Sequence, residues 1–114
     1  MGRRADAKRL NALTERIAWI VFDRLTSDES RAVLAFADSE GLSRAEALAS
    51  FYRTQYPIVC REMMEFASRH RSENLFKANE SRLYDQAFRI AAGSVYGDGT
   101  ADEAVRLALT PPEA

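Results

Sequence analysis

A chain of 114 residues is long enough to bury one hydrophobic core but not two, which predicts a single domain. Apolar residues make up 46% of the chain and charged residues 29%, a globular composition that excludes the disordered and fibrous classes. The formal net charge of -1 excludes a strong overall attraction to nucleic acid or to an anionic membrane.

The most hydrophobic stretch, Arg16–Leu25, reads RIAWIVFDRL. Steps of 100° per residue place four of its apolar side chains and two before it in one stripe, which predicts an amphipathic helix over about 5–25. The stripe consists of Leu10, Leu13, Ile17, Ile20, Val21 and Leu25. A strand is the alternative, because Ile, Trp, Val and Phe favour strands, but the segment lacks the alternation of a half-buried strand.

Trp19 and Phe22 fall on the far side of this predicted helix, away from the stripe. The helix is therefore apolar nearly all round between residues 17 and 22. Such a helix needs a cover on two sides, from the rest of the domain or from another protein chain.

Three Ser/Thr-x-x-Glu motifs predict helix starts at Thr26–Glu29, Ser43–Glu46 and Thr100–Glu103, because the hydroxyl and the glutamate can cap the first turn. Gly41 is typical of a left-handed stop at the end of a helix. Pro57 suits the first turn of a new helix and disfavours helical backbone at the residue before it.

The same periodicity test predicts further helices over about 28–39, 44–56, 58–70, 73–92 and 101–109. The predicted fold is all-α, a compact bundle of five to six helices in a single domain over residues 1–110. Residues 1–4 and 111–114 are expected to be disordered ends. Ile90 is assigned to the buried face of the helix over 73–92.

Few residues could carry chemistry. His70 is the only histidine and Cys60 the only cysteine, which excludes an internal disulfide, a cysteine zinc cage and a two-histidine metal site. Cys60 and His70 stand ten residues apart on one predicted helix, about 15 Å along its axis, too far for a thiolate–imidazole pair. We expect no catalytic residue, metal or cofactor, and a non-enzymatic function.

No apolar segment approaches the roughly 20 residues of a membrane span, and no hydrophobic signal core follows the first residues. Together with the single cysteine, this predicts a cytoplasmic protein without membrane contact. Arginine outnumbers lysine fourteen to two, a bias that indicates a bacterial source.

The first functional hypothesis is a binding or regulatory protein that docks to a protein partner or to a second copy of itself. The unpaired apolar side of the first helix and the basic segment before it are the expected contacts, since exposed apolar patches mark interaction sites. These contacts are Trp19, Phe22, Arg3, Arg4 and Arg9.

The alternative is DNA binding. The segment Ala32–Arg53 resembles the helix-turn-helix pattern, with Gly41 at the turn, and is similar to the helix pair of ribbon-helix-helix repressors and plasmid mobilisation proteins. This resemblance implies a nucleic-acid contact by Ser43, Arg44, Ser50 and Arg53. Glu40 stands where the helix-turn-helix pattern usually has an apolar residue, and this hypothesis ranks second.

Overall fold

The computed structural model describes residues 3–110, which form five helices and no strand. The helices are α1 (Arg3–Leu25), α2 (Asp28–Ser39), α3 (Arg44–Arg69), α4 (Glu73–Tyr96) and α5 (Asp98–Leu109). The predicted all-α fold is confirmed, and the strand alternative for Arg16–Leu25 is wrong because that segment is the second half of α1.

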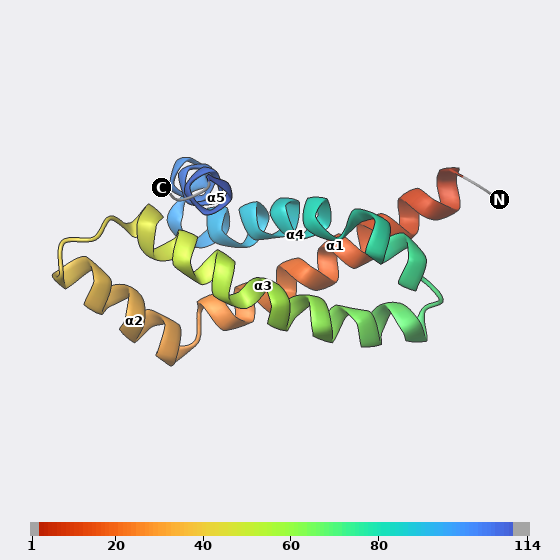
Figure 1. The fold of residues 1–114 in the computed structure, drawn as a ribbon, viewed down its shortest axis with the longest axis horizontal. Coiled ribbons are helices and arrows are strands. Elements are labelled where there is room, and N and C mark those ends of the chain that lie inside the picture. The colour runs from red at the N-terminus through yellow and green to blue at the C-terminus, as the bar shows by residue number, and fades with distance from the viewer. Residues whose placement is uncertain (1–2, 111–114) are drawn as a thin grey trace.

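The three long helices form the body of the molecule. Helices α1 and α4 run in the same general direction and pack against each other, and α3 runs in the opposite direction beside them (Figure 1). Helix α5 lies across the end of α4 and the first half of α3, and α2 lies outside the three-helix body beside the first turns of α3. The bundle is therefore built around α1, α3 and α4, with two shorter helices attached at one end.

The core lies between these three helices and extends to α5, which packs on α3 and α4. Four residues of the predicted stripe on α1 are buried, namely Leu13, Ile17, Val21 and Leu25. Helix α4 contributes the largest buried rings. The core residues from the other helices include Val59, Met63, Phe76, Leu83, Tyr84, Phe88 and Val105.

The start of α1 differs from the expected boundary. Arg3 and Arg4, placed in a disordered end by the sequence analysis, are the first residues of the helix. Alanine and arginine favour helices, and Asp6 in the first turn lies near the positive end of the helix dipole. The remaining residues assigned to disordered ends, 1–2 and 111–114, lie outside the described part of the chain.

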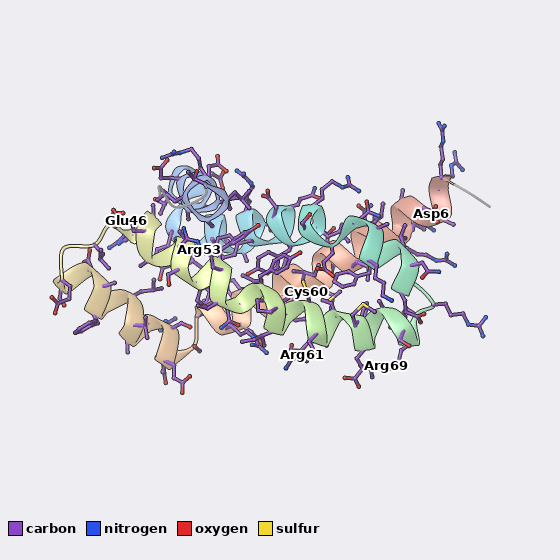
Figure 2. The ribbon with its side chains drawn as sticks, in the orientation of Figure 1. Asp6, Glu46, Arg53, Cys60, Arg61 and Arg69 are labelled. Atoms are coloured by element: carbon purple, nitrogen blue, oxygen red, sulfur yellow. The ribbon has the colours of Figure 1, made fainter. Side chains whose placement is uncertain are left out.

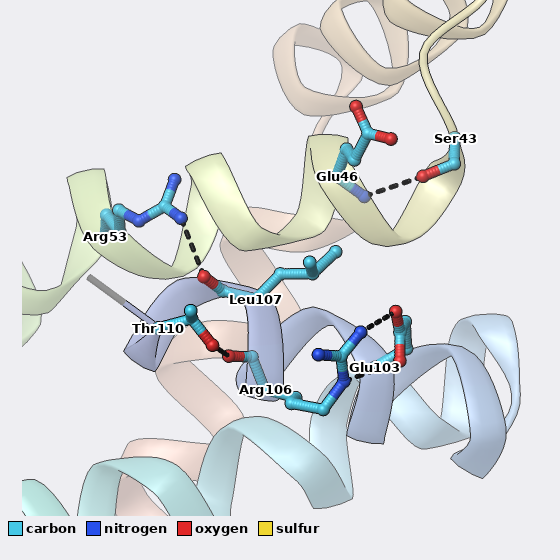
Figure 3. Close-up of polar contacts among 7 residues, drawn as sticks. All are labelled: Ser43, Glu46, Arg53, Glu103, Arg106, Leu107 and Thr110. Atoms are coloured by element: carbon cyan, nitrogen blue, oxygen red, sulfur yellow. Dashed lines mark hydrogen bonds and ion pairs between the residues drawn. The ribbon is translucent and has the colours of Figure 1, made fainter. Parts of the chain in front are cut away.

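At one of the three predicted capping motifs the hydroxyl caps the first turn as expected. The Ser43 hydroxyl accepts a hydrogen bond from the Glu46 amide at 3.1 Å, at the start of α3 (Figure 3). At the second motif Thr26 donates its hydroxyl back to the Phe22 carbonyl, and Ser27 caps α2 instead. The third motif is wrong as a helix start, because α5 begins at Asp98 and Thr100 lies inside its first turn.

Gly41 ends α2 as predicted. Its φ of +83° is a left-handed conformation that favours glycine. The Leu42 amide donates to the Ala37 carbonyl at 3.0 Å and the Gly41 amide to the Asp38 carbonyl at 3.1 Å. This pair of bonds is the Schellman arrangement, which satisfies the last carbonyls of the helix.

The predicted break at Pro57 is wrong. Helices expected over 44–56 and 58–70 are one helix, α3, with Pro57 in its interior. A proline there costs about 3 kcal/mol, because it lacks the amide proton that would bond to the Arg53 carbonyl and its ring crowds that turn. Both Pro57 and Arg53 are exposed, so water can solvate the released carbonyl, and apolar packing on both sides of Pro57 holds the helix together.

Candidate docking surfaces

Trp19 lies on the surface of α1. Its side chain is 60% exposed, and its ring meets the half-buried ring of Phe22 edge-to-face with 5.9 Å between the centroids. A large apolar side chain at this exposure gains little from the fold of its own chain. The two residues singled out in the sequence are thus neighbours, with Phe22 partly packed against the core and Trp19 in solvent.

A surface hollow of about 490 Å³ opens beside Trp19, between α1 and α4. We call this depression the Trp19 hollow. Its lining residues are Asn11, Thr14, Glu15, Ala18, Trp19 and Phe22 of α1, with Gln86, Ile90, Ala91 and Ser94 of α4.

Ile90 is the hollow residue that sequence reasoning misplaced. It was assigned to the buried face of its helix, but its side chain is 55% exposed on the rim of the Trp19 hollow. Periodicity gives the faces of a helix and not how far a neighbouring helix covers each face. Trp19 and Ile90 therefore present two large apolar side chains from two helices to one depression.

The basic residues of α1 do not join this surface. Arg3, Arg4 and Arg9 are exposed on the first turns of α1. Arg9 lines a separate shallow depression with Phe66 and His70 of the α3 end. Ten residues separate Arg9 from Trp19, about 15 Å along the helix axis, so one small ligand cannot touch both.

A second apolar depression lies between α2 and α3. It encloses about 460 Å³, and we call it the α2–α3 groove. Its large exposed side chains are Val33 at 65%, Phe36 at 66% and Leu42 at 47%. The charged residues of its lining are Glu29, Glu40 and Glu46.

The four residues of the DNA-binding alternative surround the turn between α2 and α3 or follow it along α3. Ser43 uses its hydroxyl as the helix cap, and exposed Ser50 lines the α2–α3 groove. The Arg53 guanidinium donates to the carbonyls of Leu107 at 2.9 Å and Ala108 at 3.4 Å, at the end of α5 (Figure 3). Arg44 is exposed. Of the four residues, Ser43 and Arg53 are thus bonded within the chain, whereas Arg44 and Ser50 face solvent.

Cys60 lies on the inner side of α3, while Arg61 and Arg69 point outward (Figure 2). Burial raises the pKa of its thiol to about 12, and the charge of Glu80 acts in the same direction. Tyr56 donates its hydroxyl to Glu80 at 2.9 Å, and burial followed by this bond raises the pKa of Tyr56. A thiol held protonated in this way is the reverse of an activated nucleophile.

His70 caps the end of α3 rather than lying in the core. Its backbone amide donates to the Phe66 carbonyl at 3.2 Å, and its exposed ring lies 4.3 Å from the Phe66 ring, centroid to centroid. Over residues 3–110, no three histidine, cysteine or acidic side chains gather in a way that could hold a metal ion. Within the same range, every helix is too short or too polar to span a bilayer.

Comparisons with protein-family models, with curated proteins and with solved structures find no match to this chain. The two apolar depressions are the surface features of the described residues that bear on function.

Proposed function

We propose that this chain is a non-catalytic binding protein that docks an α-helix of a protein partner in the Trp19 hollow. The observation that carries the proposal is the joint exposure of Trp19 and Ile90 on opposite walls of one apolar depression. Tryptophan dominates the binding energy of many protein interfaces, because it removes a large area from water at a small entropic cost.

The shape of the hollow supports a helical occupant. Its lining on α1 runs from Asn11 to Phe22, about 16 Å or three helical turns at 1.5 Å per residue. The lining comes from two helices packed side by side, and the depression between them can receive the apolar face of a third helix, with side chains at spacings of three and four residues. The neutral polar residues Asn11, Gln86 and Ser94 edge this groove and can bond to the backbone or side chains of a partner.

In this role the protein acts as a regulator, inhibitor or adaptor in the cytoplasm. Cys60 is the only cysteine and so forms no internal disulfide, which is compatible with the cytoplasmic part of the proposal. Exposed Arg3, Arg4 and Arg9 would act at a distance, by attracting an acidic partner before contact.

The test compares capture of partners from cells of the source organism by the wild-type chain, by Trp19→Ala and by Ile90→Ala. The matched control is Ile58→Ala, an exposed apolar residue of α3 outside both depressions. Once a partner is purified, its affinity should fall about 30-fold for Trp19→Ala, the equivalent of about 2 kcal/mol for an interface hot spot, and stay unchanged for the control. Trp19 is the only tryptophan, so its fluorescence reports occupancy of the hollow directly.

Two results would overturn the proposal. The first is equal partner affinity in wild type and Trp19→Ala. The second is a dimer that forms with rising concentration and is lost in Trp19→Ala, which would make a second copy the occupant. Unfolding measurements on Trp19→Ala should show a loss below about 1 kcal/mol, as expected for an exposed side chain.

DNA binding through residues 32–53 stays a prediction, and we do not advance it as a second function. Arg53 is bonded to the end of α5, and the neighbouring groove is lined by three glutamates that would repel phosphates.

A further inference from the structure

We propose that the α2–α3 groove is a second docking site, which binds a basic amphipathic helix of a protein partner. This site is formed by different helices from the Trp19 hollow, and it does not depend on the proposed function of that hollow.

Helix α2 is well formed, yet its own chain leaves most of its apolar surface uncovered. Ser27 caps its start and the Gly41 turn closes its end. Ala37 is nevertheless its only buried residue, while Val33 and Phe36 remain about two-thirds exposed. Since most of the stability of a short helix comes from packing an apolar face, a helix in this state favours a partner that covers it.

Leu42 extends the uncovered surface beyond the helix. The residue after a left-handed glycine stop usually packs back on the helix it follows. Here Leu42 is 47% exposed and lines the groove with Phe36 and Ala47. The groove therefore has apolar residues on α2, on the turn and on α3.

The charge of the groove selects its occupant. Glu29, Glu40 and Glu46 line it, and its lining includes no arginine or lysine. Residues 28–46 as a whole hold five acidic side chains against Arg31 and Arg44. An apolar strip edged by carboxylates is complementary to a helix with apolar residues on one face and lysine or arginine beside them. The same charges disfavour nucleic acid and anionic lipid.

The experiment uses a labelled synthetic peptide of about 18 residues, five helical turns of leucine and lysine arranged as an amphipathic helix. Its twin carries glutamate in place of every lysine. Fluorescence anisotropy with the full chain should show saturable binding of the basic peptide that weakens as salt rises. The acidic twin should bind at least tenfold more weakly.

Two sets of variants locate the binding. Val33→Ala/Phe36→Ala removes exposed apolar groups, and the triple Glu29→Gln/Glu40→Gln/Glu46→Gln removes the charges without changing the shape of the groove. Each should weaken the basic peptide at least tenfold. The matched control is Asp6→Asn/Asp23→Asn/Glu65→Gln, which removes the same charge from exposed sites outside the groove and should leave binding unchanged.

Several results would contradict the proposal. Equal binding of the two peptides, or an equal loss in the two triple variants, would show that the charge of the groove selects nothing. Loss of binding in Trp19→Ala but not in Val33→Ala/Phe36→Ala would move the peptide to the other hollow, which overturns this inference and leaves the proposed function standing. The chain could also associate with itself, and the triple glutamine variant of the groove could abolish that association. The occupant would then be the basic start of α1 in a second copy, and not a helix of another protein.

Discussion

Tyr84 shows how single residues connect the long helices. Its ring is fully buried in α4, and its hydroxyl donates to the backbone carbonyl of Tyr52 in α3 at 2.9 Å. The rings of Tyr52 and Tyr56 meet it edge-to-face, with centroids 4.8 and 4.9 Å away. A buried hydroxyl without a partner costs free energy, so this hydrogen bond specifies how α4 sits on α3.

Tyr84→Phe should lower the free energy of unfolding by about 1–1.5 kcal/mol, because the variant loses one buried hydrogen bond while its ring stays in place. Urea denaturation followed by circular dichroism measures this difference. The control is Tyr96→Phe, at a half-buried tyrosine outside these contacts, which should change stability little. Equal losses in the two variants would show that the bond to Tyr52 has no special weight.

At the scale of helices, the ends are decided by local hydrogen bonds. Ser43 and Thr100 stand in the same sequence motif, yet only Ser43 caps a helix. Gly97, with a φ of +92°, turns the chain so that α5 begins three residues before its predicted first residue, Ala101. Thr100 is therefore the third residue of α5, and not the residue before the helix that could cap it.

Ser43→Ala should destabilise the protein by about 1 kcal/mol, the usual cost of removing a helix cap. Thr100→Ala should be neutral or slightly stabilising, since alanine is the better residue inside a helix. Thermal or urea unfolding of both variants under one set of conditions gives the comparison. If Thr100→Ala lowers the free energy of unfolding more than Ser43→Ala does, the sequence motif would be a better guide to the helix start than the observed cap, which contradicts this account.

The whole molecule is longer than a compact domain of its size. Its radius of gyration is 14.9 Å, against about 13 Å expected for this chain length, and its longest extent is 51 Å. Helix α2 at one end and the first turns of α1 at the other extend beyond the three-helix body (Figure 1). The α2–α3 groove lies at the α2 end of this shape, while the Trp19 hollow lies between α1 and α4 of the body.

The protein should lose stability in alkali. Burial raises the pKa of Tyr52 and of Cys60 to about 12 and raises those of Tyr56 and Tyr84 as well. Groups whose pKa is raised in the folded state stabilise it fully below the pKa of the unfolded chain, about 9 for the thiol and 10 for the phenols. This contribution is lost progressively from pH 9–10 up to about 12.

The free energy of unfolding, measured in urea from pH 8 to 12, should therefore fall above pH 9. Only two lysines are present and arginine stays charged, so loss of positive charge contributes little in this range. Cys60→Ala should move the onset of the fall from about pH 9 toward pH 10, where the phenols of the unfolded chain ionise. A stability that stays level up to pH 12 would contradict this account of the core.

Sequence by itself determined what local forces decide. The 100° spacing of apolar residues predicts α1 and its buried stripe, and the Gly41 turn follows from a conformation that glycine adopts most easily. The exposure of Trp19 also agrees with its predicted place on the far side of that stripe. These features depend on residues a few positions apart, whose interactions are present before the chain packs.

Tertiary structure decided the features that depend on distant neighbours. Packing on both sides of Pro57 keeps α3 continuous, although the local preference there is a break. The extent to which α1 covers α4 leaves Ile90 in solvent, and the position of α5 engages Arg53. Periodicity assigns a face to each residue, but only the assembled helices decide which faces are covered, and so where the two candidate docking surfaces lie.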